Sequence, residues 1–169
     1  MIKDDTLIYV KTTETCNLNC DHCFTSGING AKIYFNPEAV AKWCNELKEL
    51  RPQMNTHFEY HGGEPFLAPV EDLWKFYELT QEKWNGSATY GITTNLVIKL
   101  TDKRLEFLDV VCNKRIGTSW DPTIRFDNEK QKELFESNVK LLLDRGYTIK
   151  LFVSLTNDTI EMGPEKLLR

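Results

Sequence analysis

Cys16-Asn-Leu-Asn-Cys20-Asp-His-Cys23 is the stretch that decides how this sequence is interpreted, because it places three cysteines within eight residues. The chain has five cysteines in all, an odd number with uneven spacing, which suits a metal site better than a set of disulfides. Cysteine thiolates hold iron–sulfur clusters. Three of them around a four-iron cluster leave one iron open to a further ligand, as in a catalytic metal site.

The three cysteines are also compatible with two alternative roles. A noncatalytic module could use Cys16, Cys20 and Cys23 with His61 to bind structural zinc, which needs a fourth ligand. His22 is wedged between two of the cysteines, and His61 is distant in the sequence. The second alternative is a purely structural α/β domain, in which the thiols are only packed.

Strand-like and helix-like segments alternate along the whole chain. The segment Pro37–Leu50 has apolar residues at helical spacing, with Asn36 as a cap and Pro37 at the first helical position. Strands are predicted at Leu7–Thr12, His57–His61, Ala88–Thr94, Arg115–Trp120 and Thr148–Leu155. Helices are predicted at Pro37–Leu50, Val70–Trp84, Asp102–Leu108 and Glu129–Arg145, with the first turn of another at Pro164–Leu168.

This alternation predicts an α/β fold with a parallel sheet of five strands and right-handed crossovers. Chemistry in such folds gathers at the carboxyl ends of the strands. The cysteine loop, a Gly-Gly-Glu-Pro segment and Asn95 each follow a predicted strand, and Ser119 lies at the end of another. We therefore expect one site at this edge.

The cysteine motif after the first strand resembles the signature of the radical S-adenosylmethionine (SAM) superfamily. The resemblance implies a partial (βα)6 TIM-like barrel of the radical SAM type, with about five strands present. It implies that Cys16, Cys20 and Cys23 bind a 4Fe-4S cluster whose open iron chelates SAM. A reduced cluster then cleaves SAM to a 5′-deoxyadenosyl radical, which abstracts hydrogen from the substrate. His22 takes the position that lies near the adenine in that family.

Four further segments carry the same resemblance. Gly62-Gly63-Glu64-Pro65 is similar to the segment with which the family binds the methionine amino group, although a strand-to-helix turn also favours these residues. By the same resemblance Asn95 contacts the SAM ribose, whereas an Asn ending a strand is also ordinary turn chemistry.

The segment Ile116–Pro122 resembles the Ser-x-Asp-Gly-Pro stretch of the branch with a SPASM or twitch extension, which contains peptide-modifying enzymes and sulfatase maturases. Ser119 would contact the SAM carboxylate, although this sequence lacks the glycine of that stretch. Lys130 takes the position of an arginine that reaches the same carboxylate, and Arg125 is the alternative.

Other residues have plainer interpretations. We expect Cys44 and Cys112 to be packed structure. His57, Glu59 and His61 share one strand face and could line the interior. No residue is identified as the partner that quenches the substrate radical, so the catalytic residues stay unknown.

The composition limits the partners. A net charge of −4 without a basic cluster argues against nucleic acid and acidic membranes. No stretch is apolar enough for a signal peptide or a membrane span. We expect a cytoplasmic location, where thiols stay reduced.

From these observations we expect residues 1–169 to form one radical SAM core domain that is incomplete at its C-terminus. The resemblance implies a flavodoxin- or ferredoxin-type electron donor and a peptide or protein substrate. A small stand-alone enzyme acting on a nucleotide or another metabolite is the alternative.

Overall fold

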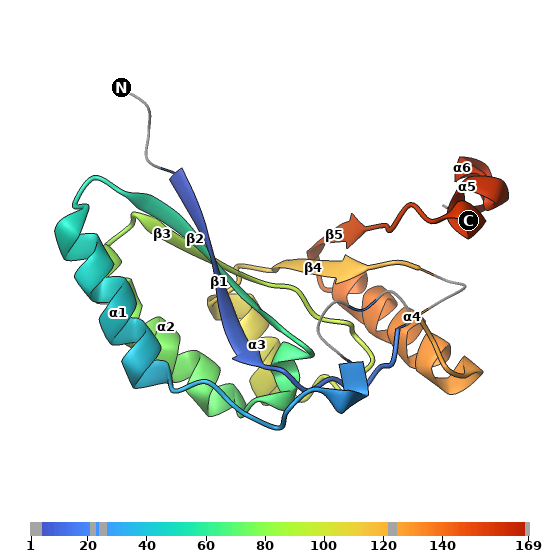
Figure 1. Ribbon diagram of the computed structural model, residues 1–169, viewed down its shortest axis with the longest axis horizontal. Helices are drawn as coiled ribbons and strands as arrows, with labels where there is room; N and C mark the ends of the chain where they lie inside the picture. Colours follow the sequence, from blue (N-terminus) through green and yellow to red (C-terminus); the bar gives the residue numbers. More distant parts are fainter. Residues whose placement is uncertain (1–4, 21–22, 24–26, 122–124, 168–169) are drawn as a thin grey trace.

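The structure, a computed structural model, describes residues 5–20, 23, 27–121 and 125–167. Figure 1 shows strands and helices alternating along the chain, with the helices on the outside of an arc of strands. The strands are β1 (Asp5–Thr13), β2 (Asn55–Gly62), β3 (Ala88–Ile92), β4 (Arg115–Ser119) and β5 (Thr148–Phe152). The longer helices are α1 (Pro37–Leu50), α2 (Val70–Trp84), α3 (Asp102–Val110) and α4 (Glu129–Asp144). Two short helices follow, α5 (Asn157–Met162) and α6 (Pro164–Leu167), and the 3-10 turns are η1 (Gly27–Asn29) and η2 (Pro65–Leu67).

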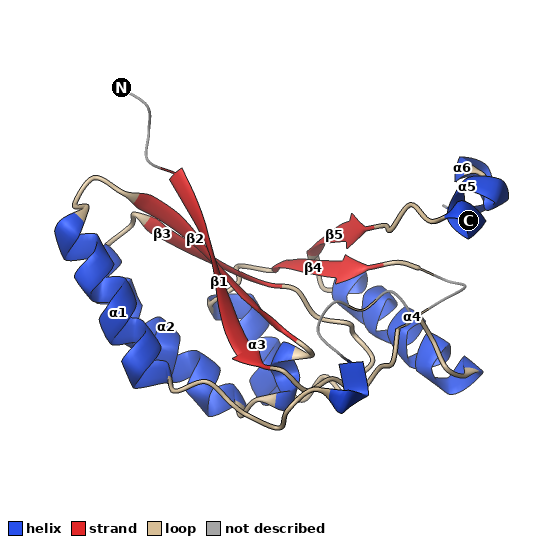
Figure 2. Cartoon of the chain, viewed as in Figure 1, coloured by secondary structure: helices blue, strands red, loops and turns tan. Residues whose placement is uncertain are grey.

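All strand pairs are parallel, as predicted. β1, β2 and β3 form one sheet in that order, and β4 pairs with β5 in a second. A single parallel bridge between Thr93 and Gly117 joins the two sheets, and the Thr94 amide donates to the Gly117 carbonyl at 3.0 Å. Figure 2 shows the resulting arc of strands, which does not close. The predicted α/β fold with a partial barrel is therefore confirmed.

The core lies between the outer face of the sheet and the helices. Side chains of β2 alternate between the two faces, so that Phe58 and Tyr60 point into this core. The Phe58 ring lies 5.3 Å from Phe76 and 5.2 Å from Trp84, both in edge-to-face contact. The Tyr60 hydroxyl donates to a backbone carbonyl of α2 at 2.9 Å. These contacts fix the sheet against α2.

Local sequence determines most of the element boundaries. The Asn36 side chain accepts from the Ala39 amide at 2.9 Å, and Pro37 begins α1 as predicted. The observed bounds of α1 and α2 are the predicted ones, and the predicted turn at Pro164 is observed as α6. β3 and β5 end earlier than predicted, at Ile92 and Phe152.

Two cysteines outside the loop confirm their plainer interpretation. Cys44 and Cys112 are each 1% exposed and belong to the core.

Candidate functional site

The cysteine loop begins directly after β1 and is partly buried. Leu18 anchors it in the core at 1% exposure, and the Cys23 amide donates to the Cys20 carbonyl at 3.0 Å. All five cysteines of the chain are free thiols, so the three loop cysteines are not consumed by disulfides.

Hydrogen-bond donors face the sulfur of Cys16, and the positive charge of Arg125 lies near Cys20. The Cys16 Sγ lies 3.4 Å from the Leu18 amide and 3.5 Å from Asn95 Nδ2, and both nitrogens carry hydrogens to donate. Burial raises the pKa of the Cys16 thiol, and these hydrogen bonds oppose the rise. Burial also raises the pKa of Cys20, whereas the positive charge of Arg125 lowers it. The donor set therefore fits the metal-bound sulfurs of an iron–sulfur cluster.

Asn95 connects the end of β3 to the cysteine loop. Its Nδ2 donates to Asn17 Oδ1 at 2.7 Å, and its Oδ1 accepts from the Val97 amide at 2.8 Å. Asn17 in turn donates to the Val97 carbonyl at 2.5 Å. Sequence reasoning assigned Asn95 to the SAM ribose and missed this network. The ribose contact stays a prediction, and the observed partners of the amide are protein groups.

The carboxylate of Glu64 is inside the protein, at 0% exposure. Its Oε1 accepts from the Phe66 amide at 3.0 Å and from the Thr94 hydroxyl at 2.8 Å, and its Oε2 accepts from the Asn95 amide at 2.7 Å. Burial raises the pKa of Glu64, and these hydrogen bonds oppose the rise. The Glu64 side chain thus holds the Gly-Gly-Glu-Pro segment against the end of β3.

The two glycines before Glu64 permit a close backbone contact with the segment that leads into the cysteine loop. A Cβ on Gly63 would lie 2.0 Å from the Thr15 carbonyl oxygen, and one on Gly62 would lie 2.3 Å from the Thr13 carbonyl oxygen. Gly62 also has a φ of 150°, which side chains disfavour. The Gly63 amide donates to Thr13 at 3.0 Å and the Glu64 amide to Thr15 at 2.9 Å. These contacts bring the first two motifs together.

Arg125 is the cation closest to the loop among the residues that the sequence suggested. It is 6% exposed, its Nη2 lies 3.4 Å from the Asn95 carbonyl oxygen, and its Nη1 lies 3.9 Å from Asp121 Oδ2. Burial lowers its pKa, and the nearby Cys20 and Asp121 oppose this shift. Lys130 lies exposed in the first turn of α4. Both assignments to the SAM carboxylate stay predictions, and Arg125 is the one placed beside the loop.

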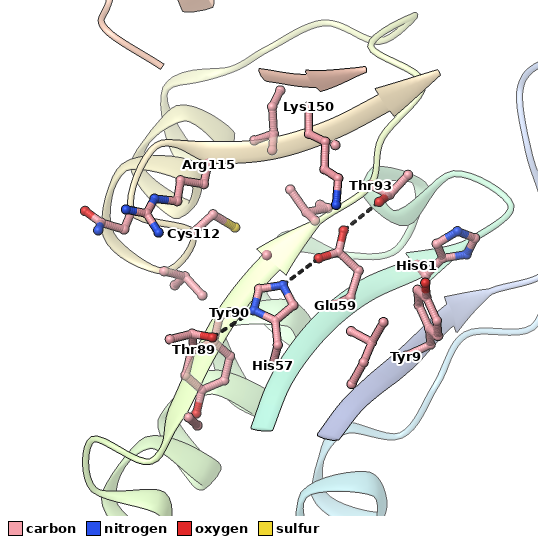
Figure 3. A pocket seen from close by; sticks show the side chains of 18 of the residues that line it. Tyr9, His57, Glu59, His61, Thr89, Tyr90, Thr93, Cys112, Arg115 and Lys150 are labelled. Carbon is pink, nitrogen blue, oxygen red and sulfur yellow. Dashed lines mark hydrogen bonds and ion pairs between the residues drawn. The ribbon is translucent and has the colours of Figure 1, made fainter. Parts of the chain in front are cut away.

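The remaining predicted residues differ in position. His22 lies outside the described residues, so its place near the adenine stays a prediction. Ser119, at the end of β4, and Gly62, at the end of β2, both line a pocket between the inner faces of the strands. This barrel pocket has a volume of about 1250 Å³. His61 also lines it, with its ring 5.2 Å from that of Tyr9 (Figure 3).

A hydrogen-bonded chain crosses the wall of the barrel pocket. His57 Nε2 lies 2.9 Å from Glu59 Oε2, and the Thr93 hydroxyl donates to Glu59 Oε1 at 2.5 Å. The other His57 nitrogen lies 2.8 Å from the Thr89 hydroxyl (Figure 3). The strand pattern indicated His57, Glu59 and His61 as lining residues, and this interpretation is confirmed. Their hydrogen-bond partners, Thr89 of β3 and Thr93 just after it, were not foreseen, although the two-residue alternation along this segment would have suggested them.

The described part of the chain gives no support to zinc with His61 as a ligand. No three His, Cys, Asp or Glu side chains there converge in a way that could hold one metal ion. A cluster has a different requirement, because each cysteine binds a separate iron corner.

Sequence comparison identifies curated relatives, although no family model matches the chain. It is 29% identical over 133 residues to an S-adenosylmethionine-dependent nucleotide dehydratase from Fibrobacter sp. (strain UWH6), covering 71% of this chain and 40% of that protein. It is 29% identical over 126 residues to a serine-type anaerobic sulfatase-maturating enzyme from Bacteroides thetaiotaomicron, covering 69% and 29%. The chain thus spans less than half the length of either relative.

Solved structures share the fold. Native anSMEcpe with bound AdoMet matches with a TM-score of 0.75 at 21% identity, over 93% of this chain and 45% of the other. The same protein with bound AdoMet and Cp18Cys peptide matches with a TM-score of 0.73 at 22% identity, over the same shares.

Among the described residues, no helix has both the length and the apolar character needed to cross a membrane. The names of both curated relatives agree with the resemblance to SAM-dependent enzymes that the cysteine motif carries, and the solved structures show that the chain shares the fold of anSMEcpe.

Proposed function

We propose that this chain is the core of a radical SAM enzyme, with a 4Fe-4S cluster on Cys16, Cys20 and Cys23. When bound, the cluster and SAM supply a reductive cleavage that yields a 5′-deoxyadenosyl radical for hydrogen abstraction. The protein's own task is to bind, orient and shield these groups.

One observation carries this proposal: three sequence motifs that are distant along the chain meet at Cys16. Asn95 donates toward the Cys16 sulfur, and Glu64 accepts from the Asn95 amide. Gly63 packs its backbone on the segment before Cys16. If each motif were only a structural turn, the three motifs would not need to contact one another.

The SAM contacts are proposed residue by residue. Gly62 and Gly63 offer backbone groups to the methionine end, because the Glu64 side chain is already engaged within the protein. Ser119 lines the barrel pocket, and Arg125 supplies a buried positive charge beside the loop for the carboxylate.

Two substrate classes each have a specific observation in their favour. The solved structures with bound peptides support a peptide or protein substrate, as does the sulfatase-maturating relative. The nucleotide dehydratase relative supports a nucleotide. Substitutions of the residues that line the barrel pocket would distinguish these two substrate classes.

We also propose an electron donor, a cellular location and a domain organisation from this chemistry. The cluster needs a one-electron donor of the flavodoxin or ferredoxin type. Cysteines that must remain reduced suit the cytoplasm. We also propose that residues 1–169 form a single core domain.

The test is anaerobic reconstitution with iron and sulfide, followed by reduction, addition of SAM and mass spectrometry of 5′-deoxyadenosine. Cys20→Ala should abolish both the cluster spectrum and the product. Cys44→Ala is the matched control, because Cys44 is packed in the core at 1% exposure, and it should retain both. A colourless, air-stable protein that binds one zinc would refute the proposal.

A further inference from the structure

We propose that the buried ion pair of Arg125 and Asp121 sets the reduction potential of the cluster on the cysteine loop. The charge of Arg125 makes the cluster easier to reduce, and the charge of Asp121 limits that effect. The inference rests on the proposed function, because it concerns the cluster of the same site. The affected step is the transfer of one electron from the donor protein to the cluster, in which no bond of the protein forms or breaks.

The two side chains form a charged pair inside the protein, at 6% and 0% exposure. Arg125 Nη1 and Asp121 Oδ2 are 3.9 Å apart, which is longer than a hydrogen bond of about 2.7–3.2 Å. The other Asp121 oxygen, Oδ1, accepts from the Ser154 amide at 2.9 Å. Within the described part of the chain, the buried Arg125 Nε has no hydrogen-bond acceptor. Asp121 therefore neutralises the guanidinium charge only in part.

Arg125 lies against the loop that carries the cysteines. The Cys20 Sγ is 3.8 Å from the Arg125 carbonyl oxygen. The Arg125 Nη2 donates to the Asn95 carbonyl at 3.4 Å, and the Asn95 side chain lies 3.5 Å from the Cys16 Sγ. Burial raises the pKa of the Cys20 thiol, and the charge of Arg125 opposes that rise. The guanidinium charge thus acts on a cysteine that would bind the cluster.

Little water is available to screen this charge. The Arg125 Cζ lies 5.9 Å from the centre of the Phe135 ring, and Trp120 stacks on the same ring at 5.5 Å. Charges act more strongly on one another where water is excluded. Reduction by one electron adds a negative charge to a cluster, and net charge is among the features that set cluster potentials. A fixed cation beside the loop therefore favours the reduced form.

Two other charged groups of the site are less suited to this role. Glu64 is also buried, but two backbone amides and a hydroxyl donate to its carboxylate and offset its charge. Lys130 lies exposed on α4, where water and salt screen it. The pair of Arg125 and Asp121 is therefore the one to change.

The test measures the midpoint potential of the reconstituted cluster in the full protein, by redox titration followed with electron paramagnetic resonance and without SAM. Arg125→Gln should make reduction less favourable by about tenfold or more, which is a fall of about 59 mV for one electron. Asp121→Asn should raise the potential, because it removes the negative charge while its amide oxygen still accepts from Ser154. Damage to a merely structural pair would move both variants in the same direction.

Three further measurements serve as controls. Arg125→Lys keeps the charge and should restore the potential to near that of the wild type. Lys140→Gln makes the same change of charge as Arg125→Gln on the exposed side of α4, where Lys140 pairs with Asp144, and should leave the potential unchanged. Iron content and thermal melting show that each variant is loaded and folded. SAM is omitted because a residue that acted only on the SAM carboxylate would not alter the potential of the cluster alone.

The inference is overturned by an unchanged potential in Arg125→Gln, by an equal fall in Arg125→Lys, or by shifts of the same sign in Arg125→Gln and Asp121→Asn. If Arg125→Gln does not hold the cluster, Asp121→Asn decides the matter, and a potential that does not rise refutes the inference. A wild type that forms the cluster and cleaves SAM, with variants of unchanged potential, loses only this inference. A wild type that forms no cluster loses the proposed function and this inference with it.

Discussion

The two faces of β2 have opposite properties, although their residues alternate along one strand. On the outer face, Phe58 and Tyr60 are 0% exposed and packed against the helices. On the inner face, the side chains of His57 and Glu59 are 42% and 14% exposed and line the barrel pocket. The outer face provides apolar burial that stabilises the fold. The inner face keeps polar groups that are accessible to a ligand.

The same contrast separates two glutamates. Glu64 is enclosed and accepts from two backbone amides and a hydroxyl, of which the amides can only donate. Glu59 accepts from Thr93 and faces His57, whose ring nitrogen can either donate or accept. We therefore expect the fold to tolerate changes at Glu59 far better than at Glu64.

The largest effect is expected on the outer face. Phe58→Ala should lower the free energy of unfolding by about 3–5 kcal/mol, because it leaves a cavity among Phe76, Trp84 and Tyr90. Urea denaturation measures this change. His57→Ala on the inner face of the strand is the control, and an equal loss of stability there would contradict the comparison.

Glu64→Gln should lower the free energy of unfolding by about 1–3 kcal/mol, because the new NH2 group faces backbone amides, which cannot accept a hydrogen bond.

The variant should also remove a pH dependence of the stability. Burial raises the pKa of Glu64, so the folded state binds more protons than the unfolded state between the ordinary and the raised pKa values. Stability contributed by this group should therefore fall as pH rises through that window. Denaturation midpoints measured across pH that show the same slope for both proteins would contradict this assignment.

Asn95→Ala should lower the free energy of unfolding by roughly 1 kcal/mol, because it removes the hydrogen bonds that tie the cysteine loop to the segment after β3. Its more specific result should be faster alkylation of Cys16 in the metal-free protein, measured by mass spectrometry. Alkylation of Cys112, which is buried elsewhere, serves as the internal control. Unchanged labelling of Cys16 would show that Asn95 does not restrain the loop.

The smallest change in stability is expected for Glu59→Gln, within about 0.5 kcal/mol. The glutamine oxygen still accepts from Thr93, and its NH2 group donates to His57 once the ring adopts the other tautomer. The Thr89 hydroxyl then accepts from the His57 Nδ1 hydrogen. Urea denaturation beside Glu64→Gln tests the difference, and a comparable loss in both would remove the distinction between the two glutamates.

The success of sequence reasoning differed between local and distant contacts. The start of α1 depends on Asn36 and Pro37, which are neighbours of the helix, and it was predicted correctly. The predicted end of β3 was wrong by two residues, because Thr94 and Asn95 turn away to meet Glu64. That contact spans about thirty residues and leaves no periodic signal in the sequence.

The sequence by itself determined the parallel α/β fold, the cysteine loop after β1 and the polar inner face of β2. Each of these depends on spacing along the chain, either the period of a strand or helix or the crowding of three cysteines. Only the tertiary structure decided that Glu64 is a buried acceptor, that Arg125 rather than Lys130 lies beside the loop, and that Asn95 reaches the Cys16 sulfur. The physical reason is that hydrogen bonds and burial depend on which segments the packed helices bring together, and residue type alone does not specify the partner.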